Sequence, residues 1–592
     1  MTAMPSSAAG STSASAARQI AGPVIVVGAG PVGSTTALLL ADAGVRVVML
    51  ERHAGPHPLP RAVHLDDEVV RTLYRAGVGE AFLARSRACS GLRLLDARHR
   101  VMAEFARAGS GVHGVPQANM FHQPDLEELL LGRVAGHPLI ALHRSAEVVA
   151  ISDQAGPRGL PVAAAIARTG ASGAERTFEG SFVLGCDGAG STVRDLVGVA
   201  MEDLGFTERW LVIDIRVPAG LATWDGVEQV CDPARAATFM QVTGDRYRWE
   251  FQLHDGEDEA ALVTPDALGR LLAPWTGRPD LADVEITRSA SYTFRARLAS
   301  RLRAGRVFLL GDAAHLTPPF IGQGLGAGLR DADNLAWKIA DVMAGRSGDD
   351  LLDSYDAERR PHARAMVKKA VMIGWVMTGG QDRAAAVRRI ALAAAMRAAP
   401  VRDAVAATAT PPLRTGAMRA GGRRTPAWRG ARIRTGGLIP NPVVQVPGGA
   451  PARLDAILAG RTTVLTARTP EEALTDLCDR YGMQLLRVGP EAAPSAPARR
   501  GPVLAGRPGA TPDRWIEVRL SDGEAPGPLR GLIADPALAI LVRPDRVIAS
   551  IAAGGRLPEV PWPIRPHPKG PKDPPQTAAS AGCPGPAAPT GQ

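Results

Sequence analysis

The 592-residue chain is poor in aromatic residues and in lysine. Aromatic residues make up 4% of the sequence and are scattered along it, and only five of the 68 basic residues are lysine. A surface that binds nucleic acid needs basic residues clustered on one face, and single strands also need interleaved aromatic rings. The net charge of +9 comes instead from arginine spread along the chain. We therefore expect no nucleic-acid partner.

Cysteine and long apolar stretches are also scarce. The five cysteines lie far apart, at positions 89, 186, 231, 478 and 583, with no CxxC and no Cys/His pair at metal-ligand spacing. This pattern indicates a reducing compartment and argues against a disulfide framework or a bound metal. No apolar run reaches membrane-spanning length, and the Ser/Ala-rich start lacks the regions of a secretory signal. We expect a cytoplasmic protein without membrane contact.

The first motif that carries chemistry is a glycine-rich turn in VIVVGAGPVGSTTALLLADAGVRVVMLER, residues 24–52. Gly28 permits a tight turn, Gly30 lets a pyrophosphate approach the backbone, and Gly33 lets the helix pack on the strand. The start of that helix offers N–H groups and a positive dipole end to phosphates. Glu51 follows Gly33 by 18 residues, where an acid accepts hydrogen bonds from ribose hydroxyls. The pattern predicts a β-α-β site for a dinucleotide.

A second glycine-rich segment, GRVFLLGDAAHLTPPFIGQGLGAGLRDADNLAWKIA at residues 305–340, indicates which dinucleotide binds. A strand, Val307 to Leu310, ends on Gly311-Asp312, and a helix follows a run of prolines and glycines. A nicotinamide dehydrogenase has no use for this turn. An extended FAD needs it, because its ribityl chain and ring lie beyond the pyrophosphate. Asp312 can accept from a ribityl hydroxyl, and the helix start can direct N–H groups at the flavin.

Apolar periodicity predicts the elements around these motifs. Apolar residues at helical spacing predict helix over 64–84, and HQPDLEELLLGRVAG predicts another over 122–136. In the segment after Gly311 one apolar stripe is expected to be buried. Its members are Leu325, Leu329, Ala332, Ala336, Ile339 and Met343.

These segments resemble the single-component FAD-dependent aromatic-ring hydroxylases, the p-hydroxybenzoate hydroxylase-like group. Three signatures match over about residues 21–375: GAGPVG with Glu51-Arg52, CDGAGSTVR at 186–194, and the Gly311-Asp312 segment. The resemblance implies FAD as cofactor and NADH or NADPH as co-substrate. It also implies the cofactor-binding residues Gly28, Gly30, Pro31, Gly33, Glu51, Arg52, Arg61, Gln123, Asp187, Gly188, Gly311, Asp312, Pro319, Gly324, Leu325 and Gly326.

The start of the second helix departs from the family pattern. Many relatives read GQGMNSG where this chain reads GQGLGAG, so the polar side chains are lost at Gly326 and Ala327. The backbone donors remain, and flavin binding is expected to survive. The departure bears on the redox potential or on the fit of the substrate.

Several charged residues have two interpretations each. Asp187 either caps a helix or serves flavin and nicotinamide binding, and its motif favours the second. His315 either packs beside the flavin or transfers a proton, and Arg61 either contacts FAD or is a surface charge. Arg246 or Arg248 either pairs with a substrate carboxylate, which arginine holds bidentately, or is an exposed strand arginine. His315 and Arg248 are thus the catalytic candidates, and no base for a phenol is evident.

The expected fold class is α/β. A Rossmann-like FAD-binding domain comprises residues 21–200 and 295–400, and a β-rich substrate domain comprises 201–294, with 90–116 as a candidate addition. Residues 425–556 resemble the thioredoxin-like C-terminal domain of larger hydroxylases of this group. They lack CxxC, which argues against thiol redox chemistry. Residues 1–20 and 557–592 are expected to be disordered tails.

The resemblance implies the reaction. NAD(P)H reduces FAD, O2 adds to it, and a C4a-hydroperoxyflavin transfers oxygen to a phenol in a dry pocket. WLVIDI, VCDPARA and YRWEFQLHDGE resemble 3-(3-hydroxyphenyl)propionate hydroxylases. This implies that 3-(3-hydroxyphenyl)propionate or 3-hydroxycinnamate is hydroxylated ortho to its hydroxyl, giving the catechol, in aromatic catabolism.

Other functions stay open at this point. The same cofactor motifs occur in monooxygenases that tailor a polyketide or antibiotic. A reductase or halogenase can use the scaffold, although the WxWxIP halogenase signature is absent. A non-enzymatic dinucleotide sensor is a further alternative. The sequence does not fix NADH against NADPH or the oligomeric state, for which a homodimer is the candidate.

Overall fold

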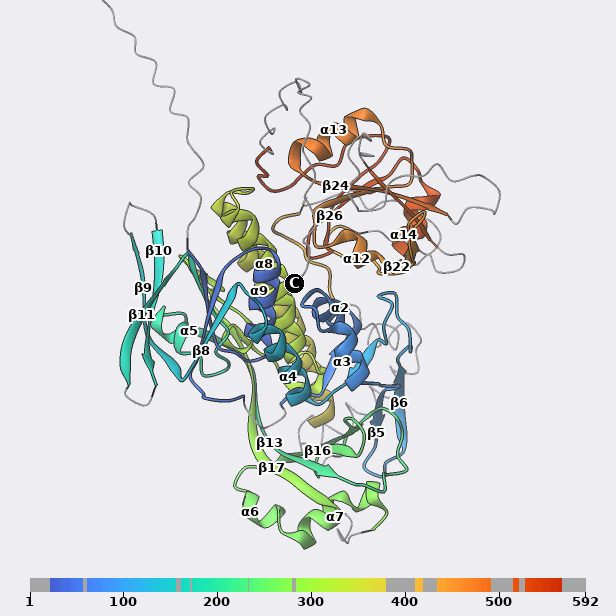
Figure 1. The fold of residues 1–592 in the computed structure, drawn as a ribbon. Coiled ribbons are helices and arrows are strands. Elements are labelled where there is room, and N and C mark those ends of the chain that lie inside the picture. The colour runs from blue at the N-terminus through green and yellow to red at the C-terminus, as the bar shows by residue number, and fades with distance from the viewer. Residues whose placement is uncertain are drawn as a thin grey trace, which may run out of the picture.

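The computed structural model describes the chain between residues 22 and 566, with gaps (Figure 1). The described residues are 22–56, 61–155, 161–170, 173–232, 234–278, 284–378, 410–418, 434–490, 515–520 and 527–566. The tail expected at 1–20 lies outside them, as do residues 567–592. Residues 557–566, expected to belong to the second tail, include Trp562, which is buried against Trp337 with ring centroids 5.7 Å apart. No helix within these described ranges is both long and apolar enough to cross a membrane.

The first unit is built on a six-stranded sheet. Its strands are parallel except for the short edge strand β18. In spatial order they are β18 (Arg303–Ala304), β19 (Val307–Leu309), β12 (Phe182–Gly185), β1 (Val24–Val27), β2 (Val47–Glu51) and β8 (Ile140–Arg144). Parallel strands need crossover connections, and here two of these connections contain long insertions. The carboxyl ends of β1, β12 and β19 are thereby brought together from three distant parts of the sequence.

Helices and a small sheet pack around these strands. α1 packs against both α4 and α8, and a three-stranded antiparallel sheet packs on the strands as well. The helices are α1 (Pro31–Asp42), α4 (Gln123–Ala135), α5 (Thr192–Leu196), α8 (Gly324–Met343) and α9 (Asp353–Thr378). The small sheet contains β9 (Ala146–Ala155), β10 (Pro161–Thr169) and β11 (Ala174–Gly180).

The helix expected over 64–84 is split into three elements. Strand β3 (His64–Asp66) joins a small sheet with β4 (Arg87–Ala88) and β7 (Ala118–Met120), and two helices follow, α2 (Asp67–Arg75) and α3 (Gly79–Arg85). Asp66 caps α2, because its Oδ1 accepts from Val69 N at 3.0 Å. Gly77, with φ +75°, separates the two helices. A polar cap and a left-handed glycine thus divide an apolar pattern that continues across both helices.

The second unit is an eight-stranded sheet that lies below the first in Figure 1. Its order is β20 (His315–Leu316), β17 (Glu285–Ala299), β13 (Met201–Arg216), β16 (Arg246–Leu253), β15 (Ala237–Gln241), β14 (Val227–Val230), β5 (Gly91–Leu95) and β6 (Val101–Ala106). Residues 91–106 therefore pair at one edge of the strands of the 201–294 region. One face is apolar and is covered by α6 (Glu259–Leu262) and α7 (Pro265–Thr276), with Trp249 in its core. The alternation of side chains along a strand turns Arg248 and Glu250 to the opposite face.

The third unit, at the C-terminal end, has a seven-stranded sheet and a core of its own. The strand order is β22 (Ala452–Arg453), β21 (Val443–Gln445), β25 (Ile516–Leu520), β24 (Gln484–Pro490), β23 (Thr463–Thr466), β26 (Ala539–Val542) and β27 (Ile548–Ala552). Its helices are α12 (Leu454–Leu458), α13 (Glu472–Tyr481) and α14 (Gly527–Ala534). The strands β23 and β24 are parallel, whereas β26 and β27 form an antiparallel hairpin beside β23.

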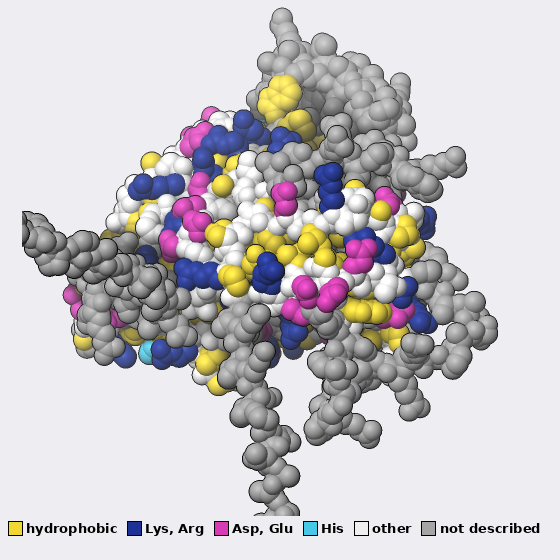
Figure 2. Space-filling view, turned by 90° about the horizontal axis from the view of Figure 1, so that it is seen from above, with side chains coloured by type: hydrophobic (Ala, Val, Ile, Leu, Met, Phe, Trp, Pro, Cys, Tyr) yellow, Lys and Arg dark blue, Asp and Glu magenta, His cyan; other side chains and the backbone are white. Residues whose placement is uncertain are grey.

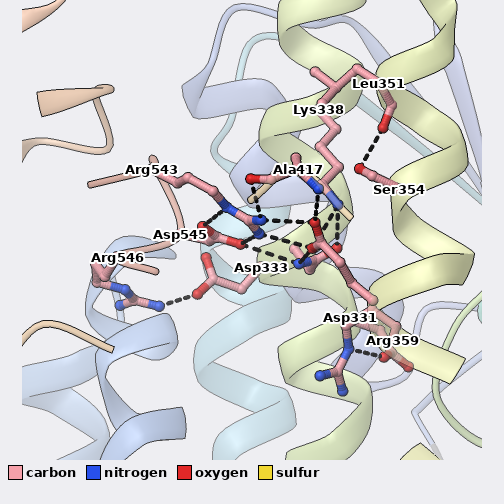
Figure 3. A network of polar contacts seen from close by, with 12 residues as sticks. Asp331, Asp333, Lys338, Leu351, Ser354, Arg359, Ala417, Arg543, Asp545 and Arg546 are labelled. Atoms are coloured by element: carbon pink, nitrogen blue, oxygen red, sulfur yellow. Dashed lines mark hydrogen bonds and ion pairs between the residues drawn. The ribbon is translucent and has the colours of Figure 1, made fainter. Parts of the chain in front are cut away.

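A buried network of charges joins the third unit to α8 and α9 (Figure 3). Arg543 donates to both carboxylate oxygens of Glu358, at 2.8 and 3.0 Å, and also binds Asp545. Lys338 Nζ lies 2.9 Å from Glu358 Oε2, and its side chain is fully buried. Arg546 pairs with Asp333 of α8. These contacts make α8 a shared element of the first and third units.

The surface seen from above carries mixed charges (Figure 2). Among the residues described on that face, Lys and Arg side chains alternate with Asp and Glu, and they form no continuous basic stripe.

Candidate active site

The first glycine turn links β1 to α1. Gly28 has φ +101°, and a Cβ there would lie 2.5 Å from the Cys186 carbonyl oxygen. A Cβ on Gly33 would lie 2.0 Å from the Gly28 carbonyl oxygen, so both positions require glycine. Gly30, in contrast, has nothing within 4 Å of where its Cβ would be, and no side chain caps α1 there. Open space therefore lies beside the N–H groups at the start of α1, as a pyrophosphate site requires.

Glu51 holds this turn from the end of β2. Its Oε2 accepts from Ala29 N at 2.8 Å, and its Oε1 accepts from His53 N at 2.9 Å. The carboxylate therefore lies beside the turn, where the ribose contact is predicted. Arg52 is exposed, and its Nε lies 3.1 Å from His53 Nε2. The contact predicted between Arg52 and FAD remains a prediction.

The second turn lies directly against the first. Gly311 has φ +61° and begins the short 3-10 helix η2 (Gly311–Ala313). A Cβ on Gly311 would lie 3.1 Å from Val32 Cγ2, and one on Gly328 of α8 would lie 2.6 Å from the same atom. Val32 belongs to the first turn of α1, so one side chain touches both glycine motifs. The two turns thus adjoin, which a single extended dinucleotide bound by both requires.

Asp331 of α8 holds the second turn from beneath. Its Oδ2 accepts from Gly311 N at 3.0 Å and lies 2.7 Å from His315 Nε2, while its Oδ1 accepts from Arg359 Nε at 2.8 Å. Burial alone would raise the pKa of Asp331, but His315 and Arg359 lower it to about 2. Sequence analysis did not single out Asp331 or Arg359. Both residues stand among other charged residues on their helices, so the sequence offers no signal that marks them.

His315 is fully buried on strand β20, beside this carboxylate. Its Nδ1 has no hydrogen-bond partner among the described residues. The contact with Asp331 fixes His315 within the second turn. A proton-transfer role for His315 remains a prediction.

Asp312 is half-buried within η2. Burial raises the pKa of its carboxyl, while the charges of Arg61 and His315 act in the opposite direction. Arg61, which is exposed, therefore lies close enough to influence Asp312. The structure brings these two predicted FAD-binding residues together from positions far apart in the sequence.

The Arg61 segment is clamped from two units. Gln123 Oε1 accepts from Arg61 N at 3.1 Å and from Ala62 N at 2.7 Å. On the other side, Arg248 donates through NH1 to the Arg61 carbonyl at 2.8 Å. Gln123, predicted as an FAD contact, thus also shapes the segment that carries Arg61.

Arg248 is not the exposed strand arginine of one interpretation, since it is 2% exposed. Its pairing with a substrate carboxylate remains a prediction. Its Nε and NH2 lie 2.6 and 3.0 Å from the two oxygens of Asp214, so its fork already holds a carboxylate of the protein. Hence a substrate carboxylate would have to compete with Asp214, because the two strands β13 and β16 place Asp214 directly opposite Arg248. Arg246 is half-buried.

The start of α8 is fixed by a polar cluster. Gln323, its N-cap residue, donates to Asp66 Oδ2 at 2.8 Å, and Arg330 donates to both Gln323 Oε1 at 2.9 Å and Asp66 Oδ2 at 2.6 Å. Despite burial, these contacts lower the pKa of Asp66 to about 2. A Cβ on Gly326 would lie 3.1 Å from Arg330 NH1. The Arg330 guanidinium thus lies close to the backbone of Gly326.

The remaining predicted contacts surround the same helix start and the third motif. Pro319, in η3 (Pro319–Ile321), and the α8 residues Gly324 and Leu325 are half-buried. Asp187 accepts from Ser191 Oγ at 2.6 Å and from Val193 N at 3.0 Å, and Ser191 is the N-cap residue of α5. Gly188 follows with φ +82°. Asp187 thus supports the start of α5, and its role toward flavin or nicotinamide remains a prediction.

Comparison with known proteins agrees with this geometry. Residues 22–370 match the family model of the FAD binding domain. A 3-(3-hydroxy-phenyl)propionate/3-hydroxycinnamic acid hydroxylase of Mycobacterium sp. (strain KMS) is 33% identical over 548 residues, covering 91% of this chain and 89% of that protein. A probable NADH-specific resorcinol 4-hydroxylase of Rhodococcus jostii (strain RHA1) is 36% identical over 375 residues, 63% of this chain and 69% of that protein.

The chain belongs to the FAD-dependent aromatic hydroxylases. Among solved structures, the flavin-dependent monooxygenase PieE, in complex with FAD and substrate, shares the fold at a TM-score of 0.72 and 23% identity, covering 91% of this chain and 97% of that one. The anhydrotetracycline hydroxylase OxyS from Streptomyces rimosus is similar at a TM-score of 0.65 and 25% identity, over 90% and 96% of the two chains.

The residues of this hydroxylase fit FAD. The open space beside Gly30, bounded by the closed positions Gly28 and Gly33, forms a cradle that any side chain would fill. The α1 N-terminus would hold the pyrophosphate, Glu51 the ribose, and Asp312 the ribityl chain. The start of α8 would direct its N–H groups toward the ring. When bound, FAD supplies electron acceptance from NAD(P)H and activation of O2.

Proposed function

We propose that this hydroxylase acts on a phenolic acid, adding oxygen ortho to the ring hydroxyl. The proposed substrates are 3-(3-hydroxyphenyl)propionate and 3-hydroxycinnamate, with the catechol as product. The observation that carries the proposal is the match to the Mycobacterium hydroxylase of that name, which extends through all three units. A match over the cofactor-binding residues alone would not distinguish the substrate.

The protein's own residues support a reaction shielded from water. Two side chains join the eight-stranded sheet to the first unit, which is the FAD-binding unit. Arg248 donates to the Arg61 carbonyl, and Gln229 donates to the Phe320 carbonyl at 3.0 Å. Phe320 also packs edge-on against Trp210, with ring centroids 5.5 Å apart. These contacts close the junction between the units with polar and aromatic side chains. A substrate bound there would be kept from solvent, which favours oxygen transfer over loss of the activated oxygen.

The third unit is proposed to be thioredoxin-like without thiol chemistry. Its β23–α13–β24 crossover followed by the antiparallel β26–β27 hairpin supports that assignment. Cys478, the cysteine described in this unit, is buried. A structural role on α8 follows from the ion network, and a homodimer is proposed as the oligomeric state.

A second function is tailoring of a larger aromatic product. It is favoured by OxyS, an anhydrotetracycline hydroxylase, which shares 25% identity over most of both chains. The resorcinol relative adds a simple dihydroxybenzene to the substrates to be compared. Both alternatives keep the cofactor chemistry and change only the substrate.

One assay separates these functions. The holoenzyme is incubated with NADH or NADPH, and both nicotinamide oxidation and O2 uptake are recorded with 3-(3-hydroxyphenyl)propionate, resorcinol or anhydrotetracycline. The proposal requires that 3-(3-hydroxyphenyl)propionate stimulates both rates and gives a catechol product. Stimulation and product formation with anhydrotetracycline alone would support tailoring instead.

A further inference from the structure

The sheet of the second unit turns a polar row of side chains toward the FAD-binding unit. Gln229 lies opposite Thr238, and Thr238 lies opposite Glu250, so these three residues share one face of adjacent strands. Gln229 reaches the Phe320 carbonyl of the FAD-binding unit. Arg248, two residues before Glu250 and on the same face, reaches the Arg61 carbonyl. Glu250 therefore lies between two points at which this sheet contacts the flavin-binding segments.

Two hydrogen-bond acceptors in this row have no partner among the described residues. Glu250 is 7% exposed, and no hydrogen bond or ion pair is found for its carboxylate within the described part of the chain. Gln229 is 2% exposed, and its Oε1 is likewise without a donor there. A buried acceptor without a donor, such as Gln229 Oε1, is costly, and each such group in a native protein calls for an explanation, for example a ligand that binds there. Both atoms accept, so their complement is a ligand that donates.

The neighbouring charges do not satisfy Glu250. Asp214 accepts two hydrogen bonds from Arg248 and also pairs with Arg288, whose NH1 lies 3.3 Å from Asp214 Oδ2. Burial raises the pKa of Glu250, Arg248 and Arg288 act to lower it, and Asp214 acts to raise it. A carboxylate of raised pKa is a stronger base than an exposed one.

We propose that Glu250 is the catalytic residue that accepts the phenolic proton of the aromatic substrate. The ring O–H bond breaks, its electron pair stays on the ring oxygen, and the proton forms an O–H bond on the Glu250 carboxylate. The phenolate is the electron-rich form of the ring that an electrophilic oxygen attacks. The inference rests on the proposed function only in requiring a substrate with a phenolic hydroxyl.

This assignment also orients the substrate. Directly beside Glu250 and the acceptor oxygen of Gln229, a substrate carboxylate would be repelled, whereas a hydroxyl would donate to them. The hydroxyl end of the molecule therefore points toward the sheet, and the carboxylate end of 3-(3-hydroxyphenyl)propionate points away from it. The Arg248 guanidinium stays paired with Asp214 and with the Arg61 carbonyl.

The first test uses the wild-type holoenzyme and its ligand. Ultraviolet difference spectra are recorded as 3-(3-hydroxyphenyl)propionate is added at a pH at which the free compound is neutral at its hydroxyl. The expected result is the red-shifted band of a bound phenolate, which the 3-methoxy analogue cannot give. Binding with the spectrum of the neutral phenol would overturn the inference without any variant being made.

The second test uses Glu250→Gln, which keeps the shape and removes the proton acceptor. The expected result is a fall in kcat/KM of about 10²–10⁴-fold, with the phenolate band lost and the FAD content unchanged. Glu228→Gln is the matched control, because Glu228 lies on β14 of the same sheet and its Oε2 accepts from Trp275 Nε1 on the opposite face. Its kcat/KM is expected to stay within twofold of wild type.

The outcomes separate the two proposals. If the wild type gives no oxygen uptake with 3-(3-hydroxyphenyl)propionate but hydroxylates resorcinol through a bound phenolate, the substrate proposal fails and the role of Glu250 stands. If the wild type hydroxylates the phenylpropionate and Glu250→Gln does so at the same kcat/KM, the role of Glu250 is wrong and the substrate proposal stands. If Glu250→Gln does not fold, the wild-type difference spectrum alone decides.

Discussion

The buried charges between the third unit and α8 allow a quantitative prediction for Arg543→Met. The guanidinium is fully buried and contacts both oxygens of Glu358, at 2.8 and 3.0 Å. It also binds Asp545 and donates to the Ala417 carbonyl at 3.3 Å. Methionine fills much of the same volume but leaves Glu358 with Lys338 as its ion-pair partner and removes the guanidinium from Asp545 (Figure 3).

The expected loss is about 3–5 kcal/mol of unfolding free energy, because removing one partner leaves a buried charge uncompensated. The pKa of Glu358 gives an independent figure of similar size. Burial raises that pKa, but Arg543 and Lys338 bring it down from 4.5 to about 2. A depression of this size corresponds to about 3 kcal/mol.

The sign of the pH dependence follows from the same pKa. In the wild type, Glu358 contributes stability that is present above pH about 4.5 and is lost as the pH falls toward 2. In Arg543→Met the pKa of Glu358 rises, so the folded variant takes up a proton as the pH is lowered. The difference in unfolding free energy between wild type and variant therefore narrows from pH 8 to pH 5. A deficit that widens on acidification would contradict this account.

Urea unfolding of the apoprotein, followed by tryptophan fluorescence, measures the loss. Trp337 lies beside Arg543 and Trp562 packs against Trp337, so their emission is expected to report the opening of this interface. Arg364→Met is the matched control, because Arg364 pairs with Glu202 at a partly exposed site where such pairs contribute below about 1 kcal/mol. Equal midpoints for the two variants would refute the reasoning.

Three further predictions concern the FAD site. Gly30→Ala should abolish tight FAD binding without changing the melting temperature of the apoprotein. Gly33→Ala should lower both the FAD affinity and the melting temperature, because of the two added Cβ atoms only that at Gly33 meets backbone. Fluorescence titration measures the affinities and thermal melts the stabilities, and equal melting temperatures for the two variants would contradict the cradle. Arg248→Met should speed FAD release at least tenfold, as measured by flavin fluorescence after dilution, since it frees the Arg61 carbonyl; an unchanged rate would argue against the clamp. Asp331→Asn should weaken FAD at least tenfold in the same titration, while Asp333→Asn, on the same helix but facing Arg546, should leave the affinity within threefold; equal effects would indicate mere destabilisation.

Much of the FAD-binding unit could be predicted from local sequence patterns. The strand 24–27, the helix that begins at Pro31 and ends before Gly44, and the helix over 122–136 are present with close bounds. Each is encoded within its own residues, by β-branched runs, by proline at a helix start and by glycine after a helix end. The division of 64–84 at Gly77 was missed because the apolar spacing continues through the break.

The polar contacts of the site could not be predicted in the same way. Arg248 has its partners 34 residues away at Asp214 and 187 residues away at Arg61, and neither spacing leaves a periodic signal. Glu250 is distinguished by its burial without a hydrogen-bond partner among the described residues, which only the packed sheet reveals. Sequence motifs identified the backbone cradle for FAD, whereas side-chain roles that depend on distant partners required the fold.

More of helix α8 is buried than the one apolar stripe that the sequence predicts. Besides that stripe, Asp331, Asp333 and Lys338 are buried, each paired with a charge from another segment. Two of these partner sets include the third unit, through Arg546 and through Arg543 by way of Glu358. The same helix begins at the residues that would direct N–H groups toward the flavin. We therefore propose that the third unit holds α8 in position through these buried ion pairs.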